Sequence, residues 1–161
     1  MPYDEKCEDV YYWSQKMIRD WNHDNESKPR GYSETNDGRK SLEVYRETKR
    51  HLMNLFEILL NRTIPDEILN SLYQVVHYSM IKEYVKAHDK YYLISIGTSP
   101  WPIGVTMVGI HERSGRAKIF TSQIAHIMND EAQKLYIQSF KRLITFSQKK
   151  FPANPSKMVL F

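Results

Sequence analysis

Few residues of this chain have the types and spacing that catalysis requires. Gly104 and Gly109 are spaced like the outer glycines of a phosphate-binding loop, but Ile110 and His111 follow where that loop needs lysine and serine or threonine. The six histidines show no zinc-ligand spacing, and no sequence neighbour of Cys7 would activate its thiol. We therefore expect a protein that is not an enzyme and that uses no cofactor and no metal.

The segment 97–128 offers binding chemistry instead. Two prolines, Pro100 and Pro102, stiffen an extended tripeptide around Trp101. A large ring presented in this way can stack on a nucleobase or fill a pocket of a partner. The same ring could equally well form a lid over a helical core, and the residues alone leave both interpretations open.

A basic cluster follows the tryptophan. Residues 105–110 alternate as a strand does, residues 112–115 have the composition of a turn, and residues 117–120 suit a return strand, which is compatible with a short β-hairpin. A solvated basic hairpin tip would have the same composition. Around the turn lie four side chains that can contact the phosphates or base edges of RNA: His111, Arg113, Arg116 and Lys118.

The rest of the chain has the periodicity of helices that would position this segment. Residues 97–128 contain two prolines and four of the six glycines, so they cannot form one helix. We expect an all-α fold: a single domain, 1–161, built as a five-helix bundle with a long loop between the fourth and fifth helices. The expected helices run from residue 7 or 8 to 24, 38 to 61, 65 to about 80, onward through 94, and 129 to about 150.

Several details of these helices are expectations of their own. The sequence leaves open whether the helix is interrupted near residues 79–82. Gly97 is expected to end the fourth helix, and Asn129 is expected to cap the start of the fifth. The tail from residue 153 to 161 is expected to be loosely held. Helical spacing predicts buried faces that include these residues: Val10, Trp13, Met17, Trp21, Leu52, Met53, Phe56, Leu59, Leu60, Ile68, Leu69, Leu72, Val75, Val76, Met80, Tyr84, Ala87, Tyr91, Ile94, Leu135, Tyr136, Phe140, Leu143, Ile144 and Phe146.

Composition fits a folded domain with an uneven charge. The single cysteine excludes a disulfide within the chain and favours a reducing, intracellular compartment, and no apolar run approaches a membrane span. The net charge is +4, but residues from 98 onward carry nine lysines and arginines against three acids, a net charge of +6 that leaves −2 for the rest. This asymmetry suggests that residues from 98 onward bind an anionic partner such as RNA. An ordinary basic face exposed to solvent would have the same charge.

The same segment resembles a known family. Residues 101–111 read WPIGVTMVGIH, followed by Arg113 and by Gly115 with Arg116, which is similar to the signature loop of the pre-mRNA-splicing factor eighteen family. The resemblance continues through residues 82–87, 125–126, 129–131, 136–138 and 141–143, and through the ending at 151–157. It is strong over the second half of the chain and lies more in pattern than in identity over the first half. The chain departs from the usual residues of the family loop at two places. These are residues 98–99 and Glu112, which is an acid in the otherwise basic tip of the possible hairpin.

The resemblance implies a function and a set of partners. It implies a five-helix domain that acts in the nucleus, in the second catalytic step of splicing (exon ligation), where its loop steadies the docked 3′ splice site of the pre-mRNA in the spliceosome. The implied partners are a zinc-knuckle second-step splicing factor and the U5 small nuclear ribonucleoprotein. An adaptor that touches only protein in the spliceosome is the alternative. Family members usually carry a further N-terminal segment.

The resemblance also assigns residues. The implied partner-binding surface lies on the first two helices, but its residues do not transfer by identity, and exposed charge alone makes Arg19 and Lys40 the candidates there. The residues of the loop 97–128 that the resemblance places against RNA or the spliceosome are Pro100, Trp101, Pro102, Ile103, Gly104, Val105, Gly109, Ile110, His111, Arg113, Arg116 and Lys118.

Overall fold

The computed structural model describes residues 1–98 and 131–159, and within them every regular element is helical. Residues 99–128 of the predicted loop, the compatible β-hairpin and the expected cap at Asn129 lie outside the described residues, whereas residues 97 and 98 are the last of α4 rather than the start of a loop. The all-α prediction is confirmed. The elements are α1 (Tyr3–Glu26), the 3₁₀ helix η1 (Tyr32–Glu34), α2 (Asn36–Leu60), α3 (Asp66–Met80), α4 (Tyr84–Thr98), α7 (Glu131–Lys150) and the 3₁₀ helix η2 (Pro155–Lys157).

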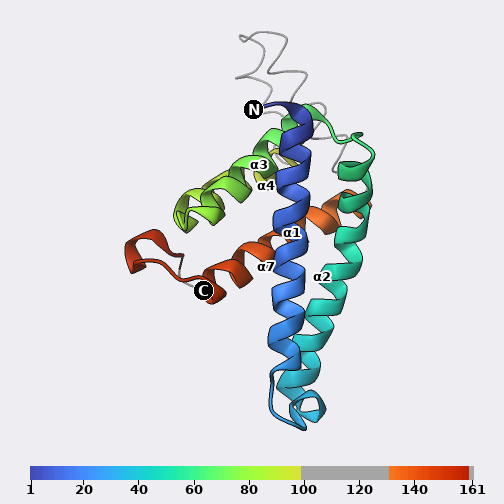
Figure 1. The fold of residues 1–161 in the computed structure, drawn as a ribbon, viewed down its shortest axis with the longest axis vertical. Coiled ribbons are helices and arrows are strands. Elements are labelled where there is room, and N and C mark those ends of the chain that lie inside the picture. Colours follow the sequence, from blue (N-terminus) through green and yellow to red (C-terminus); the bar gives the residue numbers. More distant parts are fainter. Residues whose placement is uncertain (99–130, 160–161) are drawn as a thin grey trace.

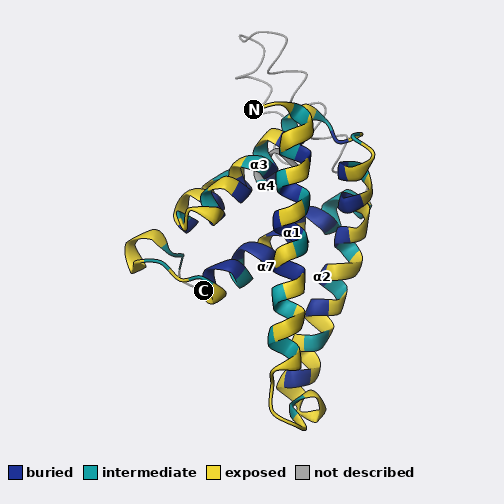
Figure 2. Ribbon diagram, viewed as in Figure 1, coloured by how far each residue is buried: buried dark blue, intermediate teal, exposed yellow. Residues whose placement is uncertain are grey.

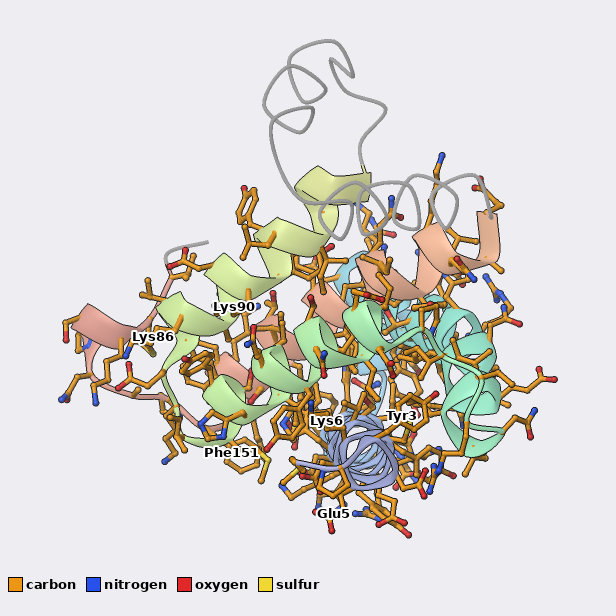
Figure 3. All side chains as sticks on the ribbon, turned by 90° about the horizontal axis from the view of Figure 1, so that it is seen from above. Tyr3, Glu5, Lys6, Lys86, Lys90 and Phe151 are labelled. Atoms are coloured by element: carbon orange, nitrogen blue, oxygen red, sulfur yellow. The ribbon has the colours of Figure 1, made fainter. Side chains whose placement is uncertain are left out.

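Two long helices form the axis of the molecule. α1 and α2 run antiparallel along its length, and α3, α4 and α7 cross this pair obliquely (Figure 1). Seen from above, α1 lies end-on while α3, α4 and α7 run side by side across it (Figure 3). Packing of α4 against α3 and α7 attaches both ends of the undescribed segment 99–130 to core helices.

The ends of α1 and α2 follow from local chemistry. α1 begins at Tyr3, earlier than expected, because Pro2 has the extended backbone of an N-cap and its carbonyl accepts from the Lys6 amide at 3.1 Å. α2 begins after Thr35, whose hydroxyl accepts from the Gly38 amide at 2.9 Å. A Cβ at Gly38 would lie 1.8 Å from the carbonyl oxygen of Tyr32, so only glycine lets η1 fold back on α2.

Two non-glycine residues in the left-handed conformation separate α2, α3 and α4. They are Arg62, with φ 57°, and Lys82, with φ 61°. The amide of Glu83 donates to the Tyr78 carbonyl at 2.8 Å. This is the six-to-one hydrogen bond that closes a Schellman-type helix end. This answers the question left open by the sequence: the chain breaks between α3 and α4. Gly97 does not stop α4, because the helix includes it and Thr98.

One hydrophobic core runs through the bundle, with buried faces turned inward and the far end of the α1–α2 pair mostly exposed (Figure 2). Most of the predicted stripes are buried. Three predictions of burial are wrong: Met53, Leu60 and Met80 are 58%, 57% and 63% exposed. Each lies at the edge of its stripe, where helical rotation carries the side chain past the neighbouring helix.

The described part of the tail, through Val159, is held rather than loose. The Gln148 side chain donates to the Val159 carbonyl at 2.7 Å and accepts from the Val159 amide at 3.1 Å. Lys157 pairs with Glu83 at 3.2 Å, and the Tyr84 hydroxyl donates to the Phe151 carbonyl. The prediction of a loose tail failed because these contacts join residues far apart in the sequence.

Candidate functional site

The residues predicted to contact RNA, from Pro100 to Lys118, lie outside the described residues. The structure describes the helices on either side of them. α4 buries Tyr84, Ala87, Tyr91 and Ile94, as predicted, and the Tyr84 hydroxyl, which donates to the Phe151 carbonyl, lies 3.1 Å from the Ser147 carbonyl of α7. The loop is therefore carried by two helices that are fixed to each other through the core.

The two candidates for partner binding are both exposed, but only one lies in a groove described below. Lys40, near the start of α2, lines a groove between α2 and α7. Arg19 is exposed on α1 and is not part of the lining of that groove. The structure thus does not bring the two residues into one groove, and it adds residues of α7 to Lys40.

This groove, here called the α2–α7 groove, has a volume of about 550 Å³. Its floor contains an aromatic pair, because Trp21 of α1 stacks on Phe146 of α7 with ring centroids 5.5 Å apart and planes within 11°. Tyr45 meets Trp21 edge-on, also at 5.5 Å. The groove is lined by Trp21, Lys40, Ser41, Val44, Gln138, Lys141, Arg142, Thr145, Phe146 and Lys149.

The charges of the α2–α7 groove are unbalanced. Its lining holds four basic side chains and no acid. Arg142 is fixed by the fold, through Glu47 at 3.5 Å and the Thr48 hydroxyl at 3.2 Å. The other three, Lys40, Lys141 and Lys149, form no ion pair with any described residue.

A second hollow continues the groove toward the turn after α1. It shares Trp21, Ser41, Phe146 and Lys149 with the α2–α7 groove and adds the basic residues Lys28 and Lys150. Here the charge is partly balanced, because Lys150 pairs with Asp24 at 2.8 Å, and that contact raises the pKa of Lys150. The surplus positive charge is therefore centred between α2 and α7.

Sequence reasoning did not single out Lys141, Arg142 and Lys149. They entered it only as part of the +6 charge from residue 98 onward and, for Lys141 and Arg142, as part of the resemblance at residues 141–143. The signal that could have found them is their spacing on one helix, since Lys141, Thr145 and Lys149 recur every four residues and so share one face of α7.

Two buried titratable groups lie close to the core rather than in the groove. Burial lowers the pKa of His88, and the positive charge of Lys141 lowers it further. Burial also raises the pKa of the Cys7 thiol, which keeps this residue in its unreactive protonated form at neutral pH. Among residues 1–98 and 131–159 no group of three His, Cys, Asp or Glu side chains could hold a metal ion.

No helix of the described part is long and apolar enough to span a membrane. The described surface offers charge and shape: an apolar lining, an aromatic pair and three lysines that form no ion pair with any described residue. Such a surface suits noncovalent recognition of an anionic partner.

Comparison with known proteins identifies the family. The family model described as the Prp18 domain matches residues 11–153, which include the four helices α2, α3, α4 and α7 and most of α1. The chain belongs to the Prp18 domain family. The resemblance noted in the sequence is therefore confirmed.

Named relatives span animals and fungi. Pre-mRNA-splicing factor 18 of Bos taurus is 48% identical over 122 residues, covering 76% of this chain and 36% of the relative. The proteins of the same name from Schizosaccharomyces pombe and Saccharomyces cerevisiae are 34% identical over 140 residues and 41% over 108, covering 87% and 66% of this chain and 41% and 43% of the relatives. The chain thus spans less than half the length of these relatives. No solved structure matches it.

Proposed function

We propose that this chain is a nuclear pre-mRNA splicing factor that acts at the second catalytic step, exon ligation. The observation that carries the proposal is the family match over residues 11–153, since the relatives are named pre-mRNA-splicing factor 18. The protein is not an enzyme in this proposal. Its helices are a scaffold, and the segment 97–128 is the element that reaches the docked 3′ splice site and steadies it.

The charge distribution supports this division of labour. The loop and α7 belong to the part of the chain that carries a net charge of +6, and phosphate contacts from lysine and arginine position a protein on RNA. Trp101 and the apolar residues after it can add stacking contacts. The spliceosome, including the U5 small nuclear ribonucleoprotein, supplies the RNA setting, and a zinc-knuckle second-step factor is the protein partner that binds the helical body.

Deletion of residues 103–116 tests the proposal. In a splicing extract that depends on this protein, the deletion should block exon joining and cause lariat intermediate to accumulate. Normal exon joining in the presence of the variant that lacks residues 103–116 would contradict the proposal. The helical circular dichroism of the variant is the control, and it should be unchanged because the described core lies entirely outside the deleted residues.

The alternative is an adaptor of the spliceosome whose loop touches only protein. The strongly basic second half of the chain favours RNA contact, but a basic surface can also bind acidic protein. Crosslinking from the loop inside the assembled spliceosome separates the two, because the adaptor would crosslink only to protein. Weak binding of the isolated chain to RNA would not separate them, since segments that order on assembly bind weakly alone.

A further inference from the structure

The rim of the α2–α7 groove carries charge that no described residue pairs with. Lys40 stands on the α2 side, and Lys141 and Lys149 stand on the α7 side. None of the three pairs with an acid among the described residues, whereas Arg142 beside them is held by Glu47. Three like charges facing one groove repel one another, so an anion placed between them would be stabilised.

The floor of the groove is apolar, which adds a second requirement for the occupant. Val44 is 37% exposed, and the Trp21–Phe146 pair lies beside it. An occupant that matches both parts must bury an apolar group on the floor while it places negative groups at the rim. Burial of apolar surface contributes affinity, and the rim charges contribute specificity and association rate.

The arrangement of the aromatic rings favours protein over RNA. Sites for single-stranded RNA present aromatic faces on which bases stack. Here Trp21 already stacks on Phe146 and meets Tyr45 edge-on, so these rings are engaged with each other rather than open to a base. The remaining uncharged residues of the lining, Ser41, Val44, Gln138 and Thr145, offer a base no further ring on which to stack.

The spacing of the lysines fits a helix. Lys141 and Lys149 are eight residues apart on α7, which corresponds to about 12 Å along the helix axis. Acidic side chains seven residues apart on a partner helix are separated by a closely similar distance of about 10.5 Å and lie on one face. Apolar side chains between them would face the floor.

We propose that the α2–α7 groove binds an acidic amphipathic helical segment of a protein partner, with carboxylates at Lys40, Lys141 and Lys149 and an apolar side chain over Val44 and the Trp21–Phe146 pair. This inference rests on the proposed function, in which a protein partner binds the helical body, and it names the surface and the chemistry of that contact. It concerns a surface of the helical body that is separate in sequence from the loop 97–128, and it can be tested without a splicing reaction.

The test is a binding titration of the full chain with labelled peptides. The probe is a helix-forming peptide of about fourteen residues with two glutamates seven positions apart and two leucines between them on the same face. A second peptide has the same composition but carries the leucines on the opposite face. A labelled oligouridylate serves as the RNA probe for comparison with the peptides. Fluorescence anisotropy is followed at low and at raised salt.

Matched variants assign the binding to the groove. The variant Lys40→Gln/Lys141→Gln/Lys149→Gln should bind the first peptide about tenfold or more weakly. The variant Arg46→Gln/Lys49→Gln/Arg50→Gln removes the same charge from exposed positions of α2 outside the groove and should change affinity less than about twofold. Val44→Asp should weaken binding as strongly as the loss of the lysines, and circular dichroism should show all variants folded.

Several results would overturn the proposal. They are equal weakening by the two triple variants, equal binding of the two peptides, preference of the groove for the oligouridylate, or absence of peptide binding to the unmodified chain. None of these results bears on the loop deletion, so the groove proposal can fail while the proposed role of the loop stands. Normal exon joining after the loop deletion would likewise leave the groove proposal untouched.

Discussion

Two grooves border α7, and they use their lysines differently. The α1–α3 groove, with a volume of about 380 Å³, is lined by Asp9, Tyr12, Trp13, Lys16, Met17, Ser79, Met80, Lys82, Ser147 and Phe151. In it Lys16 pairs with Asp20 at 3.0 Å and lies 4.4 Å from the centre of the Phe151 ring. In the α2–α7 groove three lysines have no such neighbours among the described residues.

The difference separates a seam of the fold from a surface available to a partner. Trp13 and Met17, which line the α1–α3 groove, belong to the core and are 6% and 2% exposed. Lys16 there is held by Asp20 and the Phe151 ring, whereas Lys82 in the same groove forms no ion pair with a described residue. The lysines of the α2–α7 groove stabilise nothing that the structure describes. Changes in the first groove should therefore affect folding, and changes in the second should affect binding.

The largest expected effect is in the α1–α3 groove. Trp13 packs against Phe140 with ring centroids 5.5 Å apart. Trp13→Ala should lower the free energy of unfolding by about 3–5 kcal/mol, because it leaves a cavity where three helices meet. Urea denaturation followed by circular dichroism measures this, with Val44→Ala in the other groove as the control. A loss no larger for Trp13 than for Val44 would remove the distinction between the grooves.

A smaller effect links the α2–α7 groove to the core through pH. Burial lowers the pKa of His88 below its ordinary value, with Lys141 as the second cause, so the unfolded chain takes up the proton first. The stabilising contribution is complete above pH of about 6.5 and is lost as the pH falls toward the folded-state pKa, by up to about 1.4 kcal/mol per pH unit.

Two variants check this assignment. His88→Gln should flatten the dependence of the unfolding free energy on pH below about 6.5. Lys141→Gln should leave the onset unchanged but reduce the total loss on acidification, because the folded-state pKa of His88 rises toward the ordinary value. Denaturant titrations at a series of pH values provide the measurement. Parallel curves for the unmodified chain and His88→Gln would show that other groups cause the dependence.

The contrast between engaged and isolated cations recurs at the two left-handed residues. The Arg62 side chain donates to the Leu59 carbonyl at 2.7 Å and contacts Asp4 and Glu8, whereas no hydrogen bond or ion pair is described for the Lys82 side chain. Arg62→Gly should therefore destabilise the protein by about 1 kcal/mol despite the relief of backbone strain. Lys82→Gly should stabilise it by about 0.5 kcal/mol. Thermal unfolding that ranks the two variants in the opposite order would contradict this account.

The smallest expected effect is in the α2–α7 groove. The triple variant of Lys40, Lys141 and Lys149 to glutamine should change the free energy of unfolding by less than about 0.5 kcal/mol, since exposed charges without partners contribute little to stability. The same denaturation assay applies. A loss of several kcal/mol would mean that these lysines serve the fold, and the groove would then resemble the seam beside α1 and α3.

Helical periodicity predicted most of the fold. Spacing located the five helices, because each buries one stripe, and α4 buries the four residues expected of it. It failed where distant segments decide the outcome. Met53, Leu60 and Met80 are exposed because each lies at the edge of its stripe, past the neighbouring helix, and the tail is held by contacts such as that of Lys157 with Glu83.

The candidate sites were predictable to different degrees. The loop residues stand out in the sequence because prolines, glycines and a tryptophan interrupt the helical pattern. The α2–α7 groove does not stand out, since it forms only when Lys40 of α2 meets Lys141 and Lys149 across about a hundred residues of intervening chain. Periodicity places residues on a face, but it does not say which face meets which.

The proposed role at exon ligation is tested most directly by site-specific photocrosslinking from position 101 in the assembled spliceosome. The chain carries a photoreactive amino acid in place of Trp101, and complexes are stalled just before the exons are joined. We expect crosslinks to the pre-mRNA close to the 3′ splice site, and none from the same amino acid at Lys49 on the exposed face of α2. Crosslinks from position 101 to protein alone would contradict the proposed contact and favour the adaptor.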